Sequence, residues 1–207
     1  DKDPESDPDI ALEQTQKAFD EDFDMKFYDS YGFDNTYAFM VTSETAEEYD
    51  LETTSDLAAY TDEFAVGVDT SWFNRPGDGY PAFQEAYGFE FDNIRAMQIS
   101  LVYEALNTGS LDLALGYTTD GRIPAYDLVV LEDDLQFFPP YDASPFATHE
   151  IIAEYPEIDD ALSRLVGTVS TETMQNLNYR SDEEGIEPAL VAEEFLEEHN
   201  YFEGEGE

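Results

Sequence analysis

Acidic side chains dominate this chain so strongly that they limit both how it folds and what it binds. Its 207 residues include 50 Asp and Glu against 8 Lys and Arg, which gives a formal net charge of −42. Nucleic acids and anionic lipids are bound by cationic side chains that release counterions or meet a negative surface. The composition therefore excludes nucleic-acid binding and attachment to anionic lipid as functions.

Three explanations of the acidity lead to different molecules. High net charge with few apolar residues would leave the chain disordered, but 42% of the residues are hydrophobic and 14% are aromatic, which is enough for a core. A calcium-binding protein would need oxygen ligands at fixed spacing. The acids are instead dispersed along the whole length, which is typical of a folded halophilic protein at molar salt, where the screening length is about 3 Å.

Other features of the composition exclude further classes. There is no cysteine, so disulfides and thiol chemistry are absent. The sequence lacks the run of about 18 apolar residues that a membrane-spanning helix requires. The chain opens on Asp1-Lys-Asp-Pro-Glu5 without a signal peptide, and we expect that a leader has been removed or that the chain is a fragment.

Apolar runs and helical patterns alternate through the first two thirds of the chain. We expect a first helix from Asp7 to about Glu21, because Asp7 fits an N-cap and Pro8 a first helical residue. The expected strands are Tyr37–Thr42, Phe64–Val68, Ile94–Ile99, Leu111–Gly116 and Leu128–Leu131. The helical segments between them are Ser55–Tyr60, Ala82–Tyr87 and Leu101–Asn107. This alternation predicts an α/β fold with a mostly parallel sheet.

After Pro145 the pattern predicts helices only. They are Thr148–Tyr155, Glu157–Val166, Thr171–Leu177 with Ser170 as its cap, and Pro188–His199. The last of them is amphipathic, with apolar side chains on one face and Glu side chains on the other. A helical final third after an α/β part suggests two lobes, or one lobe built from discontinuous segments.

The sequence patterns of common catalytic sites are missing. No G-x-S-x-G, H-E-x-x-H, P-loop or G-x-G-x-x-G motif occurs. His149 and His199 fall in separate expected helices, where surface roles are favoured. The run Glu132-Asp133-Asp134 fits a solvated loop better than a calcium site, because the alternating ligands and the glycine of an EF-hand are absent. We therefore predict no enzyme activity, no cofactor and no metal site.

Tyrosines stand at the ends of expected elements, beside Gly and Pro. Tyr37 opens a strand, Tyr117 ends one, and Tyr141 lies in a Pro-rich segment. Element ends are where α/β proteins place ligand contacts, although a single Tyr is more typical of packing at the edge of a core. Arg75 lies in a Gly- and Pro-rich loop, where its guanidinium either holds a ligand carboxylate through two hydrogen bonds or pairs with one of the many acids.

Six segments, taken in order, closely resemble the glycine betaine/carnitine/choline-binding proteins of ABC transporters. They are Phe33-Asp-Asn-Thr-Tyr-Ala38, Arg75-Pro-Gly-Asp-Gly79, Tyr117-Thr-Thr-Asp-Gly121, Asp127-Leu-Val-Val-Leu-Glu-Asp-Asp134, Phe138-Pro-Pro-Tyr-Asp-Ala-Ser-Pro145 and Met174-Gln-Asn-Leu-Asn-Tyr179. Each segment alone is a weak signal, but the ordered set is specific. The resemblance runs from about Asp7 to Phe202.

The resemblance implies a two-lobed, type II periplasmic-binding-protein fold with its ligand in the cleft. Residues 1–38 would form a lobe-one segment that leads into the hinge, and residues 39–126 would form lobe two. Residues 127–203 would return through the hinge to the C-terminal lobe-one helices, and residues 204–207 would be a tail. Family members carry a longer opening segment, so the resemblance also implies a fold incomplete at the N-terminus. The surface which that segment would cover predicts dimerisation or weak ligand binding.

The resemblance also implies a ligand and a set of site residues. Tyr37, Tyr117 and Tyr141 fall on tyrosines of the family's aromatic cage, and Arg75 falls on an arginine that in some members contacts the ligand carboxylate. Asn35 and Thr119 are weaker matches. A trimethylammonium group has no N–H to donate, and aromatic faces attract it instead.

The function implied is that of an extracellular solute-binding protein, associated with the cell surface through a lipid anchor or a tether in the full-length protein. It would capture quaternary-ammonium solutes, glycine betaine above all, and deliver them to the permease of an ABC importer. A compatible-solute-binding domain that serves a chemoreceptor is the alternative, and a carboxylate-dependent hydrolase is a distant one.

Overall fold

Two compact units make up the part of the chain that the computed structural model describes, residues 7–202. The first unit contains Asn35–Thr118 and Arg122–Tyr141, while Asp9–Asp34, Thr119–Gly121 and the residues from Asp142 onward belong to the second. The chain passes from the first unit to the second at residues 141–142. Before this point, Leu128–Val130 and Glu132 pair with strands and loops of the first unit.

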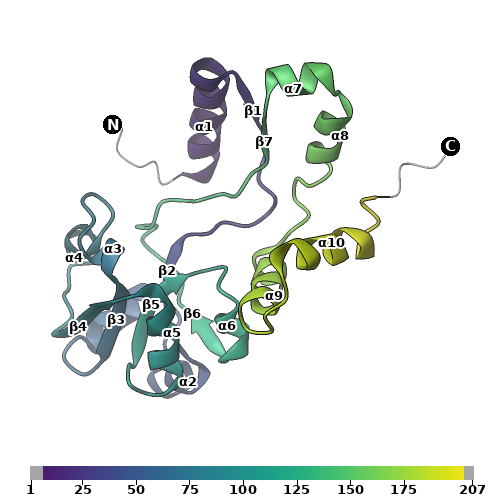
Figure 1. Cartoon of the computed structure of the whole chain (residues 1–207). Helices are drawn as coiled ribbons and strands as arrows, with labels where there is room; N and C mark the ends of the chain where they lie inside the picture. The colour runs from purple at the N-terminus through teal and green to yellow at the C-terminus, as the bar shows by residue number, and fades with distance from the viewer. Residues whose placement is uncertain (1–6, 203–207) are drawn as a thin grey trace. The chain divides into compact units, whose positions relative to one another are not determined.

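A five-stranded sheet forms the centre of the first unit, in the order β4-β3-β5-β2-β6 (Figure 1). Its strands are β2 (Tyr37–Thr42), β3 (Ala65–Asp69), β4 (Asn93–Met97), β5 (Leu113–Tyr117) and β6 (Leu128–Val130). All five lie where the sequence predicts strands, with ends shifted by a few residues; the predicted strand Ile94–Ile99 stops early because Ile99 begins a helix.

The sheet is mixed rather than mostly parallel. Strand β3 runs parallel to β4 and β5, whereas β2 runs antiparallel to both β5 and β6. The expectation of a mostly parallel sheet was therefore wrong. Alternation of strands and helices predicts that neighbouring strands run parallel. Strand β2, however, lies between β5 and β6, which come much later in the chain. The pattern of apolar residues does not show which strands become neighbours.

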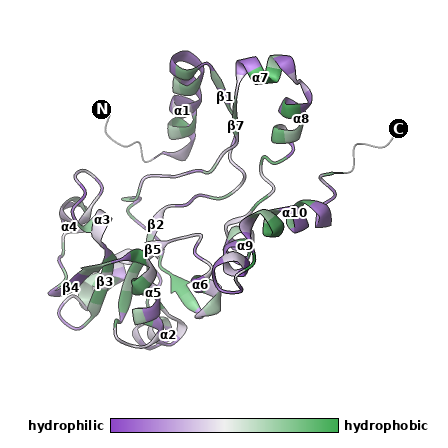
Figure 2. Cartoon of the chain, in the orientation of Figure 1, coloured by the Kyte–Doolittle hydropathy of each residue, from purple (hydrophilic) through white to green (hydrophobic). Residues whose placement is uncertain are grey.

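The two faces of this sheet carry separate apolar cores. Alternate residues of a strand point to opposite faces, so Phe39 and Val41 join a core with Trp72 and Phe83, which is rich in aromatic rings. Met40 packs on the other face with Ala114 and with Val102, Tyr103 and Leu106 of one helix. Figure 2 shows apolar colour on β5 and β6, among other elements.

Short helices connect the strands of the first unit. They are α2 (Ser43–Tyr49), the 3₁₀ helix η1 (Thr54–Ala59), α3 (Thr70–Phe73), α4 (Tyr80–Tyr87), α5 (Ile99–Asn107) and α6 (Arg122–Ala125). The predicted helical segments correspond to η1, α4 and α5. The first of these is a 3₁₀ turn whose start is fixed by a capping box between Thr53 and Asp56.

The second unit is mainly helical. Its helices are α1 (Pro8–Phe23), α7 (His149–Glu154), α8 (Glu157–Ser163), α9 (Thr171–Asp182) and α10 (Pro188–Glu198). Each was predicted, and Ser170 caps α9 by accepting a hydrogen bond from the Thr173 amide, as expected. Within residues 7–202, no helix combines the length and the apolar character that crossing a bilayer requires.

A small sheet in the second unit corrects the expectation of helices only after Pro145. Strand β1 (Met25–Phe27) pairs antiparallel with β7 (Phe146–Thr148). Three residues are too few to show an alternating pattern, so neither strand could be recognised from the sequence. Their Phe27 and Phe146 rings stack with each other and contact Phe19 of α1.

The aromatic core of the first unit should dominate its stability. Phe39 is completely buried and touches four other aromatic rings. We expect Phe39→Ala to lower the free energy of unfolding by about 3–5 kcal/mol, since the change leaves a cavity. Urea unfolding at fixed salt measures this, with Leu135→Ala at a half-exposed position as the control. A loss below about 1 kcal/mol for Phe39→Ala would contradict this description of the core.

Salt should stabilise the fold, because basic side chains are too few to neutralise the acids. The basic side chains that form ion pairs within residues 7–202 include Lys17, Lys26, Arg75 and Arg180. Raising KCl from about 0.1 M to about 1 M shortens the screening length from roughly 10 Å to roughly 3 Å. We expect the melting temperature to rise by at least about 5 °C over this range. A melting temperature that stays constant or falls would show that self-repulsion is not a major destabilising force.

Candidate functional site

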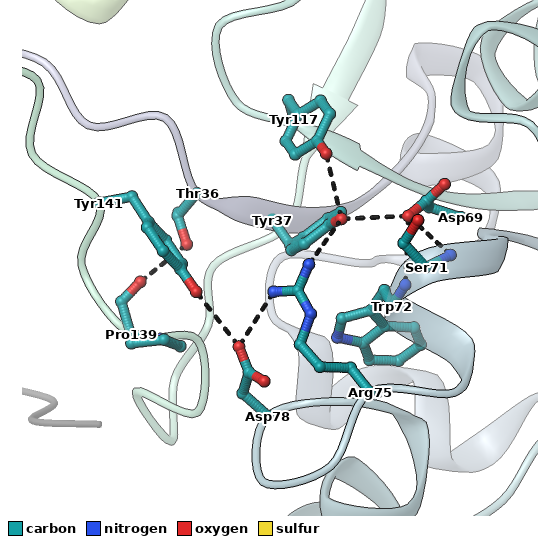
Figure 3. Close-up of polar contacts among 10 residues, drawn as sticks. All are labelled: Thr36, Tyr37, Asp69, Ser71, Trp72, Arg75, Asp78, Tyr117, Pro139 and Tyr141. Carbon is teal, nitrogen blue, oxygen red and sulfur yellow. Dashed lines mark hydrogen bonds and ion pairs between the residues drawn. The ribbon is translucent and has the colours of Figure 1, made fainter. Parts of the chain in front are cut away.

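Two tyrosines face each other across neighbouring strands at one end of the five-stranded sheet. Tyr37 opens β2 and Tyr117 closes β5, and the antiparallel register places them directly opposite each other. Directly paired residues project from the same face of a sheet. Their rings stack with centroids 4.8 Å apart. Their hydroxyl oxygens are 3.1 Å apart, and a dashed line marks this contact in Figure 3.

The carboxylate of Asp69 anchors this tyrosine pair to a third strand. Asp69 ends β3 and caps α3, and its Oδ2 accepts hydrogen bonds from the amides of Ser71 and Trp72 at 3.0 and 3.1 Å. The same oxygen accepts the hydroxyl proton of Tyr37 at 3.1 Å. A hydroxyl has one proton to give, so Tyr117 must be the donor in the contact between the two tyrosines.

Arg75 lies beside Tyr37 in the loop that follows α3. Its Nη2 donates to the Tyr37 hydroxyl at 3.4 Å, and its Cζ lies 5.3 Å from the centre of the Tyr37 ring, within the range of a cation–π contact. Gly79 allows this loop to close tightly, because a Cβ there would lie 2.2 Å from the Arg75 carbonyl oxygen and 2.5 Å from that of Trp72. Any larger residue at position 79 would therefore displace Arg75.

A second carboxylate joins Arg75 to Tyr141. Asp78 accepts hydrogen bonds on its Oδ2 from Arg75 Nη1 and from the Tyr141 hydroxyl, both at 3.2 Å (Figure 3). Tyr141 itself is 45% exposed. Its segment is held to the residue before β2 by the Thr36 hydroxyl, which donates to the Pro139 carbonyl at 3.0 Å. We call the following residues the Tyr–Arg cluster: Tyr37, Asp69, Arg75, Asp78, Tyr117 and Tyr141.

Behind Tyr117, a buried tyrosine supports the end of β5. The Tyr103 hydroxyl of α5 accepts a hydrogen bond from the Tyr117 amide at 2.6 Å. Gly116 makes room for it, because a Cβ at that position would lie 2.4 Å from the Tyr103 hydroxyl oxygen. The Arg122 guanidinium lies over the Tyr103 ring, 4.3 Å from its centre. These contacts fix the backbone from which the Tyr117 ring projects.

The ionisable groups of the cluster affect one another. Burial, then the hydrogen bond to Tyr117, and then nearby charges including Asp69 raise the pKa of Tyr37 far above its usual value. Partial burial and the charge of Asp78 also raise the pKa of Tyr141. Both tyrosines are therefore neutral at ordinary pH. Burial lowers the pKa of Arg75, but the hydrogen bond and charge of Asp78, together with Tyr37 and Tyr141, outweigh burial and leave that pKa raised.

The structure brings four of the six predicted site residues together: Tyr37, Arg75, Tyr117 and Tyr141. Asn35 is exposed. Its backbone N–H donates to the Tyr141 carbonyl at 3.0 Å, which ties the segment before β2 to the segment that contains Tyr141. Thr119 belongs to the second unit, where it is buried and its carbonyl accepts a hydrogen bond from Asn178 at 2.8 Å.

Sequence reasoning missed Asp69, Asp78 and Tyr103. Asp69 carried a usable signal, since an Asp at the end of an apolar strand and before Thr and Ser is a typical helix cap. Asp78 belonged to a segment already singled out, but nothing in its spacing shows that it pairs with Arg75. Tyr103 carried no signal, because its position looks like any apolar residue of an amphipathic helix.

The spacing of the rings limits how the cluster could hold a cation. A cation–π contact needs the cation within about 6 Å of a ring centre, and the 4.8 Å between Tyr37 and Tyr117 leaves no room for one between them. Arg75 already lies within 5.3 Å of the Tyr37 ring. The exposed Tyr141 ring and the partly exposed Tyr117 ring are thus the surfaces that a cation can reach in this conformation.

The other candidate residues have structural roles. Asp133 accepts hydrogen bonds from Tyr87 and from the Phe138 amide, and Asp134 accepts from Ser55, so the acidic run stabilises its own loop. No group of three or more His, Asp or Glu side chains within residues 7–202 is placed to hold a metal ion. His149 pairs with Asp20 at the surface.

Comparison with known proteins shows which family this chain resembles. The sequence model of the OpuAC family, described as the substrate binding domain of ABC-type glycine betaine transport systems, matches residues 5–198. The carnitine transport binding protein OpuCC of Listeria monocytogenes is 52% identical over 198 residues, which cover 96% of this chain and 64% of that protein. This chain thus spans about two thirds of the length of that relative.

Two further proteins are similar to this chain, one in sequence and one in both sequence and structure. A glycine-betaine-binding protein of Pseudomonas aeruginosa is 36% identical over 179 residues, which cover 81% of this chain and 57% of that protein. A crystal structure described as a glycine betaine/carnitine/choline ABC transporter superposes with a TM-score of 0.93 at 57% identity, and covers 98% of this chain and 74% of that one. The expected type II periplasmic-binding-protein fold is thereby confirmed.

The two tyrosine hydroxyls at the sheet end should differ in their contribution to stability. Tyr37→Phe removes a donor from the buried Asp69 carboxylate, and we expect it to lower the free energy of unfolding at pH 8 by about 1–3 kcal/mol. Among residues 7–202, the hydroxyl removed by Tyr117→Phe hydrogen-bonds to Tyr37 alone, so this change should cost less than about 1 kcal/mol. Urea unfolding of both variants measures the difference, and equal losses would contradict the anchoring role of Asp69.

Proposed function

Because the chain belongs to the family of substrate binding domains of ABC-type glycine betaine transport systems, we propose that it captures quaternary-ammonium solutes for an ABC importer. Glycine betaine is the first candidate ligand, and carnitine and choline are the others. The single observation that carries this proposal is the family match over residues 5–198. The Tyr–Arg cluster supports it, because it combines exposed aromatic surface with a cationic group.

The chemistry of the ligand explains why such a cluster is suited to it. A trimethylammonium group cannot donate a hydrogen bond, so a protein recognises it through the negative faces of aromatic rings. Tyr141 offers such a face at 45% exposure, and Tyr117 offers part of another. Neutral tyrosines suit this purpose, and the raised pKa values of Tyr37 and Tyr141 favour the neutral form.

Arg75 is the candidate for binding a ligand carboxylate. A guanidinium has more N–H groups than its hydrogen bonds to Tyr37 and Asp78 require. Its side chain is 32% exposed, so the remaining N–H groups are open to a ligand. Tyr37 then acts mainly by holding Arg75 and Tyr117, while the roles of Asn35 and Thr119 follow from the family resemblance alone.

The proposal also covers the partner, the location, the source and the oligomeric state of the whole protein. The permease of the importer is the partner, and the protein acts outside the cell, with a lipid anchor or a tether. The high acidity fits a halophilic source. Dimerisation through surface that a longer opening segment would cover is also proposed, because Phe146 and Phe23 are more than half exposed in the second unit.

The alternatives are less well supported. The family description and the name of the carnitine relative both refer to transport, so a role in serving a chemoreceptor is not favoured. The family consists of substrate binding domains, which argues at the family level against an enzyme. No acid pair in the Tyr–Arg cluster stands free, since Asp69 and Asp78 are both occupied as hydrogen-bond acceptors.

Tyr141 provides the most direct test of the proposed aromatic contact. We expect Tyr141→Ala to weaken glycine betaine binding at least about tenfold in calorimetric titration at molar salt, because the cation loses an aromatic face. Tyr155→Ala is the matched control, since Tyr155 is 43% exposed but lies in the second unit. Equal affinities of the two variants would contradict a ligand contact at Tyr141.

A further inference from the structure

The cationic group proposed to bind a ligand carboxylate already holds a carboxylate of its own chain. Arg75 and Asp78 are three residues apart and form an ion pair at 3.2 Å. The Asp78 side chain is only 12% exposed, against 32% for Arg75. Partial burial of this kind keeps the pair from being screened fully by salt.

The position of Asp78 is fixed from two sides. Tyr141 donates its hydroxyl proton to the same Oδ2 atom that accepts from Arg75. The tight turn at Gly79 keeps the loop folded back on itself, because no side chain fits between Gly79 and the Arg75 carbonyl. Asp78 therefore lies between the two residues on which ligand recognition is proposed to rest.

We propose that Asp78 is a specificity-determining residue that favours quaternary ammonium ligands without a carboxylate over those with one. The inference rests on the proposed function. A ligand carboxylate that approaches Arg75 must share the guanidinium with Asp78 and is repelled by its charge. A cation near Tyr141 is attracted by the same charge, but that attraction is common to all these ligands, so the selectivity comes from the effect of Asp78 on the carboxylate.

Electrostatics sets the expected size of the effect. Charges a few ångströms apart in a partly buried site interact strongly enough to change a binding ratio by an order of magnitude. Asp78→Asn keeps an oxygen that can accept from Tyr141 and removes the charge. We expect the ratio of glycine betaine to choline affinity to rise at least about tenfold in this variant, with carnitine following glycine betaine.

The experiment is calorimetric titration of choline, glycine betaine and carnitine into the wild-type chain and its variants at one fixed salt concentration. Asp62→Asn is the matched control, because it removes the same charge at an exposed position of the same unit, and its affinity ratio should equal that of the wild type. Thermal unfolding of each variant shows whether it is folded.

A double variant tests whether the effect acts through Arg75. In an Arg75→Gln background, Asp78→Asn should raise the affinity for glycine betaine less than it does in the wild type, since only the repulsion by Asp78 is relieved and no guanidinium is freed. An unchanged ratio in Asp78→Asn alone, or an equal gain with and without Arg75, would overturn the inference and leave the proposed function standing. Failure of the wild-type chain to bind any of the three solutes would overturn both.

Discussion

The buried carboxylate of Asp69 joins the parts of the first unit that carry the proposed site. A charge with 7% exposure is stable only when hydrogen-bond donors surround it, and these come from the start of α3 and from the first residue of β2. Because the Tyr37 hydroxyl donates its hydrogen bond to Asp69, the Tyr37 oxygen can accept hydrogen bonds from Tyr117 and Arg75. The positions of both residues thus depend on one carboxylate at the end of β3.

The strands of the five-stranded sheet could be predicted because each is a short apolar run between turns, whereas β1 and β7 are too short to show a pattern. The arrangement of the five strands could not be predicted, since β2 pairs antiparallel with β5 and β6 through contacts distant in sequence. The tyrosines and Arg75 were found through their place at element ends and through a family resemblance. The residues that hold them were missed, because the functions of Asp78 and Tyr103 arise from tertiary contacts.

The acidity of the chain acts on two scales. Over the whole surface, a net charge of −42 favours hydration and is expected to make the stability of the fold depend on salt. Within the Tyr–Arg cluster, two carboxylates lie close to one guanidinium, so the local charge also favours a cation. A ligand that is a zwitterion must place its positive end on the aromatic surface and its negative end against Arg75.

The central claim is that aromatic surface in this cluster recognises the methylated ammonium group. Calorimetric titration with glycine betaine, dimethylglycine, sarcosine and glycine tests it directly, because the series removes methyl groups while it keeps the carboxylate. Each lost methyl adds an N–H that must be desolvated without an acceptor among the rings. The affinity should fall at every step, and glycine binding as tightly as glycine betaine would contradict the claim.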